Sequence, residues 1–252
     1  MALLSIHYHS CQLKKTVLVQ MAVPDCTSGF SKPLSAYKAV YLLHGLSEDA
    51  TSWIRKSNAE RYALERGLVL VMPSVDRSMY CDGVLGQNYF TYVTQELPGY
   101  LHLVFGLSKE REQNAILGAS MGGYGAARAA LTFPERYAVW GSLSGLLDLT
   151  PMLGRLNDTV REEFPFLADH AAEVETTPLN PINLLDGGRD LRGYIACGLE
   201  DDLLICTRRF QAAAESAGVN YRFRYVPDRR HDWTFWDEPL PLFFNFILEE
   251  SV

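Results

Sequence analysis

Residues 113–130 read QNAILGASMGGYGAARAA, and this stretch decides the fold. The apolar run Ala115–Leu117 suits a buried strand, and the alanine-rich segment after Gly123 suits a helix. Between them lies the G-x-S-x-G pattern of Gly118 to Gly122, at a strand-to-helix turn. On such a sharply bent backbone both flanking positions must be glycine. The pattern therefore predicts that Ser120 presents its hydroxyl as a nucleophile at the start of a helix, where the amides favour developing negative charge.

The length and composition indicate one folded domain. The 252 residues suit a single α/β domain spanning residues 1–252, and 48% hydrophobic with 21% charged residues is ordinary globular composition. A formal net charge of −7, without a long run of Lys or Arg, argues against nucleic acid as a partner. No stretch reaches the roughly 18 apolar residues of a membrane span, and the start lacks a secretory leader pattern. We therefore expect a chain that is neither exported nor in the membrane.

The cysteines predict a reducing compartment. The five cysteines are an odd number and include no C-x-x-C pair, so neither a disulfide framework nor a zinc site is expected. We accordingly expect a cytoplasmic protein.

Short apolar runs alternate with helical segments along the chain, which predicts a mostly parallel sheet with helices on both faces. The predicted strands outside the turn at Ser120 are 16–23, 38–43, 68–72, 137–143, 191–197 and 220–226. The predicted helices after the first strands are 53–65, 89–105, 205–217 and 238–250, with a kink at Pro98. Residues 74–88 are rich in Gly, Asp and Asn and are interpreted as a long loop.

Residues 146–190 break this rhythm. The segment holds four prolines and mixed apolar and charged residues without a strong strand pattern, so a helical excursion is expected rather than core sheet. Its position between two predicted strands makes it a candidate lid. Exposed apolar residues in it would suit a subunit contact equally well, so formation of a homo-oligomer stays open.

A serine hydroxyl needs a general base, and that base needs a carboxylate to hold its tautomer. His231 lies in the loop VPDRRHDWTFW between the last predicted strand and the final helix, where the base of such a fold belongs. His7 and His9 alternate on an N-terminal strand and His102 lies in a helical pattern, whereas His170 in the excursion is not excluded. We predict His231 as the base.

The acid is expected after the strand that ends at Gly198. Three adjacent carboxylates, Glu200, Asp201 and Asp202, follow within a few residues, and a solvated acidic turn explains any one of them. The chain order of nucleophile, acid and base is that of α/β-hydrolases. The order supports an acid here without choosing among the three.

An oxyanion hole requires two backbone N–H groups, and removal of one such donor typically costs about 10²–10³ in rate. One donor is expected from Met121, the residue after the nucleophile, and the other from Leu46 in the loop after the strand 38–43. Gly45 permits the close backbone approach that this requires. His44 is interpreted as a buried residue that ties down the loop.

Together the segments LLHGLSEDATSW, GASMGGYGA, CGLEDDLL and RHDWTFW resemble the putative-esterase family of α/β-hydrolases. This group includes tributyrin, feruloyl and acetyl xylan esterases, S-formylglutathione hydrolases and mycolyltransferases, and the closest likeness is to short intracellular tributyrin esterases. The resemblance implies the α/β-hydrolase fold. It also maps the acid onto Asp201, the H-x-W motif onto His231 and Trp233, and the oxyanion donor of the H-G loop onto Leu46.

The motifs favour a serine carboxylesterase that acts on small-molecule esters with short acyl chains and needs no metal or organic cofactor. S-formylglutathione hydrolase ranks second, because the chain is short for that branch and lacks a clear glutathione signature. A feruloyl or acetyl xylan esterase is a further alternative, in which Trp53, Tyr124 and Trp233 would bind substrate. A non-catalytic binding protein with the hydrolase fold is disfavoured, because the serine, base and oxyanion glycine are all present.

Overall fold

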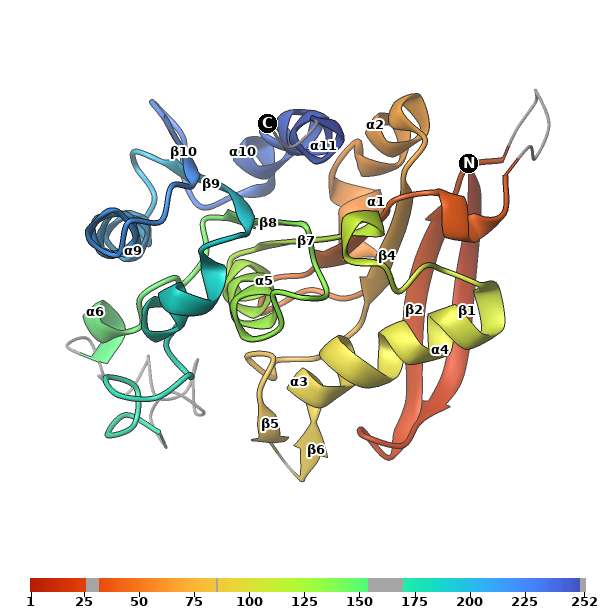
Figure 1. The fold of residues 1–252 in the computed structure, drawn as a ribbon, viewed down its shortest axis with the longest axis horizontal. Coiled ribbons are helices and arrows are strands. Elements are labelled where there is room, and N and C mark those ends of the chain that lie inside the picture. Colours follow the sequence, from red (N-terminus) through yellow and green to blue (C-terminus); the bar gives the residue numbers. More distant parts are fainter. Residues whose placement is uncertain (26–31, 85, 154–169, 250–252) are drawn as a thin grey trace.

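The computed structural model describes residues 1–25, 32–84, 86–153 and 170–249, and its centre is one eight-stranded sheet (Figure 1). The strand order is β1-β2-β4-β3-β7-β8-β9-β10. Strands β1 and β2 pair antiparallel and β2 pairs antiparallel with β4, whereas every neighbouring pair from β4 to β10 is parallel. The strands are β1 (Ala2–Ser10), β2 (Lys15–Val23), β3 (Ala39–Leu43), β4 (Val69–Pro73), β7 (Asn114–Ala119), β8 (Val139–Leu143), β9 (Arg192–Gly198) and β10 (Arg222–Val226).

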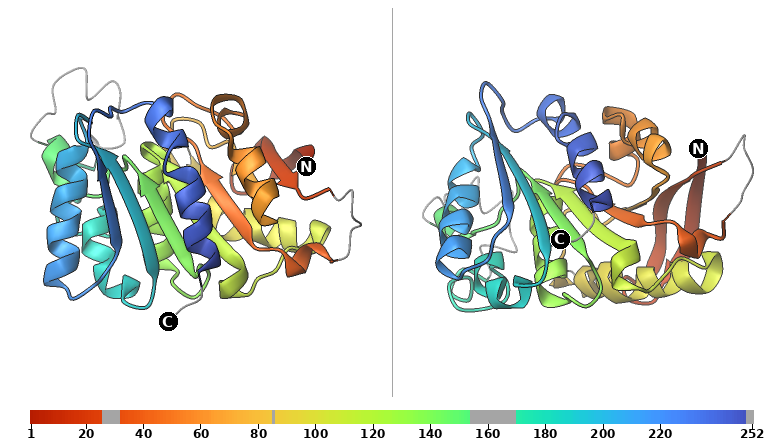
Figure 2. Two further views of the ribbon diagram at one scale, coloured as in Figure 1. Left: turned by 90° about the horizontal axis from the view of Figure 1, so that it is seen from above. Right: turned by 45° about the horizontal axis from the view of Figure 1, so that its top comes forward.

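Helices cover both faces of this sheet, which confirms the predicted layers. One buried cluster joins the sheet to α1 (Ser52–Lys56), α2 (Ala59–Arg66), α10 (Trp233–Asp237) and α11 (Leu240–Leu248). The other joins it to α3 (Tyr89–Thr91), the turn η2 (Tyr92–Glu96), α4 (Leu97–Phe105), α5 (Met121–Thr132) and α9 (Leu204–Ser216). Figure 2 shows α2 and α11, from opposite halves of the chain, side by side on one face. The buried strands β3, β4 and β7 have no polar-apolar alternation because both of their faces are covered.

Several predicted helices are divided. The helix expected over 53–65 is two helices, α1 and α2, separated at Ser57, and α2 ends at Gly67 with a left-handed φ of 62°. The helix expected over 238–250 is α11, which begins after Pro239, and α10 precedes it. The segment 89–105 has a π-helical turn ahead of α4, whose first turn contains Pro98. The predicted loop 74–88 also contains two short paired strands, β5 (Asp82–Val84) and β6 (Gln87–Asn88).

The excursion over 146–190 is described only at its two ends, which hold α6 (Thr150–Leu153) and the 3₁₀ helix η4 (Pro181–Gly188). Residues 154–169 lie outside the described residues, so the lid stays a prediction. The two ends meet at Asp148, whose side chain is fully buried. Its carboxylate accepts hydrogen bonds from Asn180 Nδ2 at 3.0 Å, from the Thr150 amide at 2.9 Å and from Arg209 Nε at 2.6 Å. These bonds hold both ends of the excursion against α9.

Among the described residues, Cys11, Cys81, Cys197 and Cys206 form no disulfide, and Cys26 lies outside the described residues. Among the described helices, none combines the length and the apolar character needed to cross a membrane.

Asp148→Asn is expected to destabilise the fold at neutral pH. Burial raises the pKa of Asp148, but hydrogen bonds from Asn180, Arg209 and Thr150 outweigh it and bring the pKa below its usual value. A carboxyl with a depressed folded pKa stabilises the fold above the unfolded pKa of about 3.9 and loses that contribution as the pH falls through the folded pKa. We expect urea unfolding at pH 7 to show a loss of about 1–3 kcal/mol. The loss should shrink below about pH 4, and an equal loss at pH 7 and pH 3 would contradict this account.

Candidate active site

The turn between β7 and α5 has the strained geometry that its sequence predicts. Ser120 has φ 56° and ψ −119°, a conformation that few residues other than glycine adopt. A Cβ on Gly118 would lie 2.1 Å from the Gly122 backbone, and a Cβ on Gly122 would lie 2.1 Å from the Leu43 carbonyl oxygen. Both flanking positions therefore require glycine. Gly123, which no sequence pattern singled out, is also constrained, since its Cβ would lie 2.5 Å from Ser142 Oγ.

The structure brings Ser120, His231 and Asp201 into one hydrogen-bonded chain. His231 Nε2 lies 2.9 Å from Ser120 Oγ, and His231 Nδ1 lies 3.1 Å from each carboxylate oxygen of Asp201. The carboxylate can only accept, so a neutral imidazole carries its proton on Nδ1 and leaves Nε2 free to accept the serine proton. This is the arrangement that general-base activation of a hydroxyl requires.

Of the three adjacent carboxylates after β9, only Asp201 contacts His231. The Asp201 side chain is fully buried, whereas Asp202 is exposed to solvent. Glu200 points away into an ion pair with Arg230, in which both side chains are exposed. The structure therefore distinguishes three residues that the sequence left equivalent. What distinguishes them is burial, because only Asp201 is shielded from solvent.

Ser144 and Trp236, to which no sequence pattern assigned a role, support the Asp201–His231 pair. Burial raises the pKa of Asp201, but His231, the Ser144 hydroxyl and the Leu203 amide outweigh it, so its pKa lies below the usual range and the carboxylate is ionised at neutral pH. Trp236 Nε1 donates a hydrogen bond to Ser144 Oγ at 3.1 Å. The Trp236 ring also meets the His231 ring edge-on, with 5.0 Å between centroids. The sequence signal that could have found Trp236 is its position shortly after His231, in the helix α10 that follows the loop.

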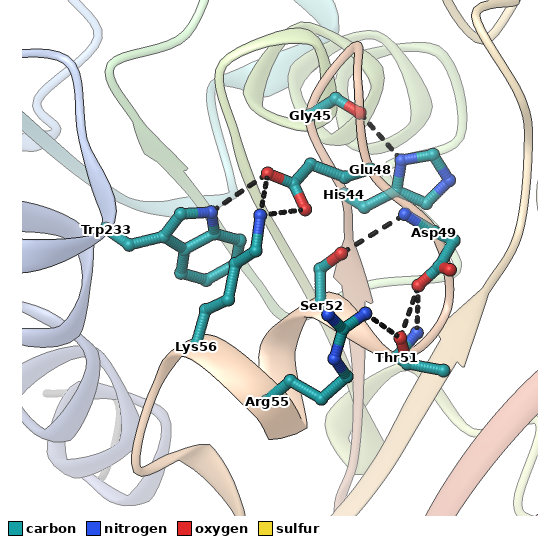
Figure 3. Close-up of polar contacts among 9 residues, drawn as sticks. All are labelled: His44, Gly45, Glu48, Asp49, Thr51, Ser52, Arg55, Lys56 and Trp233. Atoms are coloured by element: carbon teal, nitrogen blue, oxygen red, sulfur yellow. Dashed lines mark hydrogen bonds and ion pairs between the residues drawn. The ribbon is translucent and has the colours of Figure 1, made fainter.

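The loop after β3 is fixed by His44, as predicted (Figure 3). The Val75 amide donates to His44 Nε2 at 3.0 Å, so Nδ1 carries the proton and donates to the Gly45 carbonyl oxygen at 2.7 Å. Burial lowers the pKa of His44 and keeps its ring neutral. The Gly45 carbonyl and the Leu46 N–H belong to one trans peptide and point in opposite directions, so fixing one orients the other. Met121 is the first residue of α5, where amides lack partners within the helix.

The predicted substrate-binding aromatic residues lie in different environments. Trp53 and Tyr124 have no exposed surface, and the Tyr124 hydroxyl donates to the Leu179 carbonyl oxygen at 2.8 Å. They are packing residues in this structure, so we do not assign them to the binding surface. Trp233 is partly exposed, and its Nε1 donates to Glu48 Oε1 at 3.0 Å. Among the described residues, no cluster of three or more His, Cys, Asp or Glu side chains could hold a metal ion.

The fold and this constellation define a hydrolase of the α/β class with a serine at the turn between β7 and α5. Residues 10–244 match the family model described as putative esterase, and the chain belongs to that family. Membership identifies it as a hydrolase that acts on carboxylic esters.

Named relatives agree with this assignment. An acetyl esterase of Caldicellulosiruptor saccharolyticus is 26% identical over the full length of both chains. The structure of FphF, a fluorophosphonate-binding serine hydrolase of Staphylococcus aureus, superposes with a TM-score of 0.87 at 30% identity and covers 99% of each chain. An S-formylglutathione hydrolase (FrmB) of the same organism superposes with a TM-score of 0.85 at 30% identity, covering 98% of this chain and 99% of that one.

Gly118→Ala is expected to disrupt the nucleophile turn, because the new methyl group would overlap the Gly122 backbone. We expect a loss of at least about 3 kcal/mol in the free energy of unfolding, the upper range for a single substitution. Gly99→Ala is the matched control. Gly99 lies within α4, and apart from its chain neighbours and the backbone of its own helix no atom lies within 4 Å of its Cβ position, so alanine should be neutral or stabilise by up to about 1 kcal/mol. Equal denaturation midpoints for the two variants would contradict the packing account.

Proposed function

We propose that this protein is a serine carboxylesterase that hydrolyses short-chain acyl esters through an acyl-enzyme, with Ser120, His231 and Asp201 as its catalytic residues. The observation that carries the proposal is the continuous hydrogen-bonded chain from Ser120 Oγ through His231 to the buried Asp201. Its acceptor and donor pattern supports transfer of the serine proton to His231 Nε2.

In the first half-reaction Ser120 Oγ attacks the ester carbonyl carbon while its proton passes to His231 Nε2. The carbonyl π electrons move onto the oxygen, and the Leu46 and Met121 amides donate hydrogen bonds to this oxyanion. Asp201 stabilises the imidazolium without taking its proton. The oxyanion then collapses, the bond to the alkoxy group breaks, and His231 gives its proton to the leaving alcohol.

In the second half-reaction water replaces the alcohol. His231 takes a proton from the water as its oxygen attacks the acyl carbon, and the same two amides bind the second oxyanion. Collapse breaks the bond to Ser120 Oγ, which recovers its proton from His231. The carboxylic acid leaves and the free enzyme is restored.

An oxygen ester and a thioester pass through the same steps, so the substrate must come from other observations. The likeness to an acetyl esterase over the whole chain favours small acyl groups on oxygen. S-formylglutathione is the second candidate, because the solved hydrolase of that name matches at 30% identity over nearly the whole chain. Its formyl group is also a short acyl group. The two candidate substrates therefore differ in the leaving group, an alcohol for the oxygen ester and a thiol for S-formylglutathione.

Ser120→Ala is expected to lower kcat/KM by about 10⁴-fold or more, because no other group can form the acyl-enzyme. We would measure both proteins on p-nitrophenyl esters from acetate to octanoate, on methyl ferulate and on S-formylglutathione. A steep preference for short oxygen esters supports the leading proposal, and a preference for S-formylglutathione replaces it with the second candidate. Failure of the folded wild type to be labelled by a fluorophosphonate would favour a non-catalytic binding protein.

Asp201→Asn is expected to lower kcat by about 10³–10⁴-fold, because an amide no longer selects the Nδ1–H tautomer of His231. Asp202→Asn is the control at the adjacent position, since Asp202 is exposed. It should stay within about twofold of the wild type, in line with surface substitutions. If the loss fell on Asp202 instead, the proposed acid would be wrong. Steady-state kinetics on p-nitrophenyl acetate decides between them.

A further inference from the structure

One carboxylate connects the loop that carries Leu46 to the start of α10, just after His231. Glu48 Oε1 accepts hydrogen bonds from Trp233 Nε1 at 3.0 Å and from Lys56 Nζ at 2.7 Å, and Oε2 accepts from Lys56 Nζ at 2.9 Å (Figure 3). Trp233 lies two residues after His231 and 185 residues after Glu48 in the chain. The connection is therefore a tertiary contact between two segments that the proposed reaction needs together.

The Glu48 contact is more enclosed than the ordinary surface ion pairs of this protein. The Glu48 side chain is 14% exposed and Lys56 is 38% exposed, whereas the exposed fractions in the pair Arg230–Glu200 are 76% and 46%. Burial raises the pKa of Glu48, but hydrogen bonds from Lys56, Ser52 and Trp233 outweigh it, so its pKa lies below the usual value. Enclosed, charge-assisted hydrogen bonds hold geometry better than exposed pairs do.

On the oxyanion side, the backbone of Glu48 contacts the same peptide as the His44 side chain, the one between Gly45 and Leu46. The Glu48 amide donates to the Gly45 carbonyl oxygen at 3.2 Å, and this oxygen also accepts the His44 hydrogen bond. A Cβ on Gly45 would lie 3.6 Å from Ser120 Cβ and 3.7 Å from Glu48 Cγ. The loop thus passes between the nucleophile and Glu48, and its carbonyl is held from both ends of the turn.

On the base side, Trp233 transmits the contact through packed rings. Its ring meets Trp53 edge-on at 5.0 Å and Trp236 edge-on at 5.2 Å between centroids. Trp236 in turn meets the His231 ring edge-on at 5.0 Å. Trp233 is therefore held by Glu48 at its ring nitrogen and by the rings of Trp53 and Trp236. Trp236 also packs against the His231 imidazole.

We propose that Glu48 is a positioning residue that keeps the oxyanion loop and the base loop in register, so that the Leu46 amide and His231 Nε2 meet the same substrate carbonyl group. This inference rests on the proposed function, because it assigns Glu48 a role only in reaching the transition state. Glu48 itself touches neither the reacting atoms nor the triad through any hydrogen bond that the described residues show.

Glu48→Gln tests the inference with little change in shape. The amide oxygen is an uncharged and therefore weaker acceptor for Trp233 Nε1, and the charge that holds Lys56 is lost, so both contacts of the side chain weaken. Complete loss of an oxyanion donor costs about 10²–10³ in rate, so a displaced donor should cost less, about tenfold in kcat on p-nitrophenyl acetate. KM should change by less than about twofold, because ground-state binding does not use the oxyanion geometry. An alkyl boronic acid, which forms a tetrahedral adduct on the serine, should bind about tenfold more weakly.

Glu238→Gln is the matched control. Glu238 pairs with Arg229 in the same region as the base loop, the pair is about 38% exposed, and it makes no contact with the oxyanion loop among the described hydrogen bonds and ion pairs. The same substitution there should leave kcat and boronic acid affinity unchanged. Lys56→Met removes the positive charge that pairs with Glu48 and should reproduce the losses expected for Glu48→Gln. It therefore tests the inference even if Glu48→Gln does not fold.

A double-mutant cycle then tests the connection itself. Trp233→Phe removes the Nε1 donor, so its loss in kcat should not add to that of Glu48→Gln if both act through one contact. Additive losses, or a kcat for Glu48→Gln equal to that of Glu238→Gln in folded protein, would overturn the inference. A raised KM with unchanged kcat and boronic acid affinity would overturn it in favour of direct substrate contact. All of these outcomes require an active wild type, whereas a wild type without turnover or fluorophosphonate labelling removes the proposed function instead.

Discussion

The close backbone approach at the turn around Ser120 is the constraint on which the rest of the site depends. Leu43 and Gly118 are register partners on the parallel strands β3 and β7, so the two chains leave the sheet at the same level. Gly122 then lies so close to the Leu43 carbonyl that a single methyl group would not fit. The loop after β3 and the first turn of α5 are therefore fixed relative to each other by main chain. This contact brings the segments that carry the proposed oxyanion donors beside Ser120, and the His44 side chain then orients the Gly45–Leu46 peptide.

The proposed acid and base depend on side chains instead. Asp201 follows β9 and Ser144 follows β8, its parallel neighbour, so both lie at the edge where the strands of this sheet end. His231 comes from a loop that belongs to no strand, and contacts with Asp201 and Trp236 hold its ring. The Glu48–Trp233 hydrogen bond joins this side-chain half of the site to the main-chain half. The Ser120–His231 hydrogen bond is a second contact between the two halves.

The sequence predicted those features that are local. The strand, turn and helix around Ser120 follow from a few adjacent residues, and the order of nucleophile, acid and base follows from the chain itself. Asp201 could not be separated from its acidic neighbours by the residues alone, because the difference is burial, which the tertiary fold determines. The same reason applies to Trp53 and Tyr124, since an aromatic side chain suits a binding wall and a core equally well. Glu48 carried no local signal, because its partner Trp233 is remote in the chain.

Helix α5 does more than follow Ser120, the residue that caps its N-terminus. One turn further on, Tyr124 donates to the Leu179 carbonyl, and Arg128 donates to the carbonyl oxygens of Pro178 and Tyr80. Arg128 is only 7% exposed, so its guanidinium depends on these acceptors in place of water. The chain after β4 and the end of the excursion are thus both attached to the helix that positions Ser120. Substitutions near α5 must leave these attachments in place, because a displaced helix would move Ser120 away from His231.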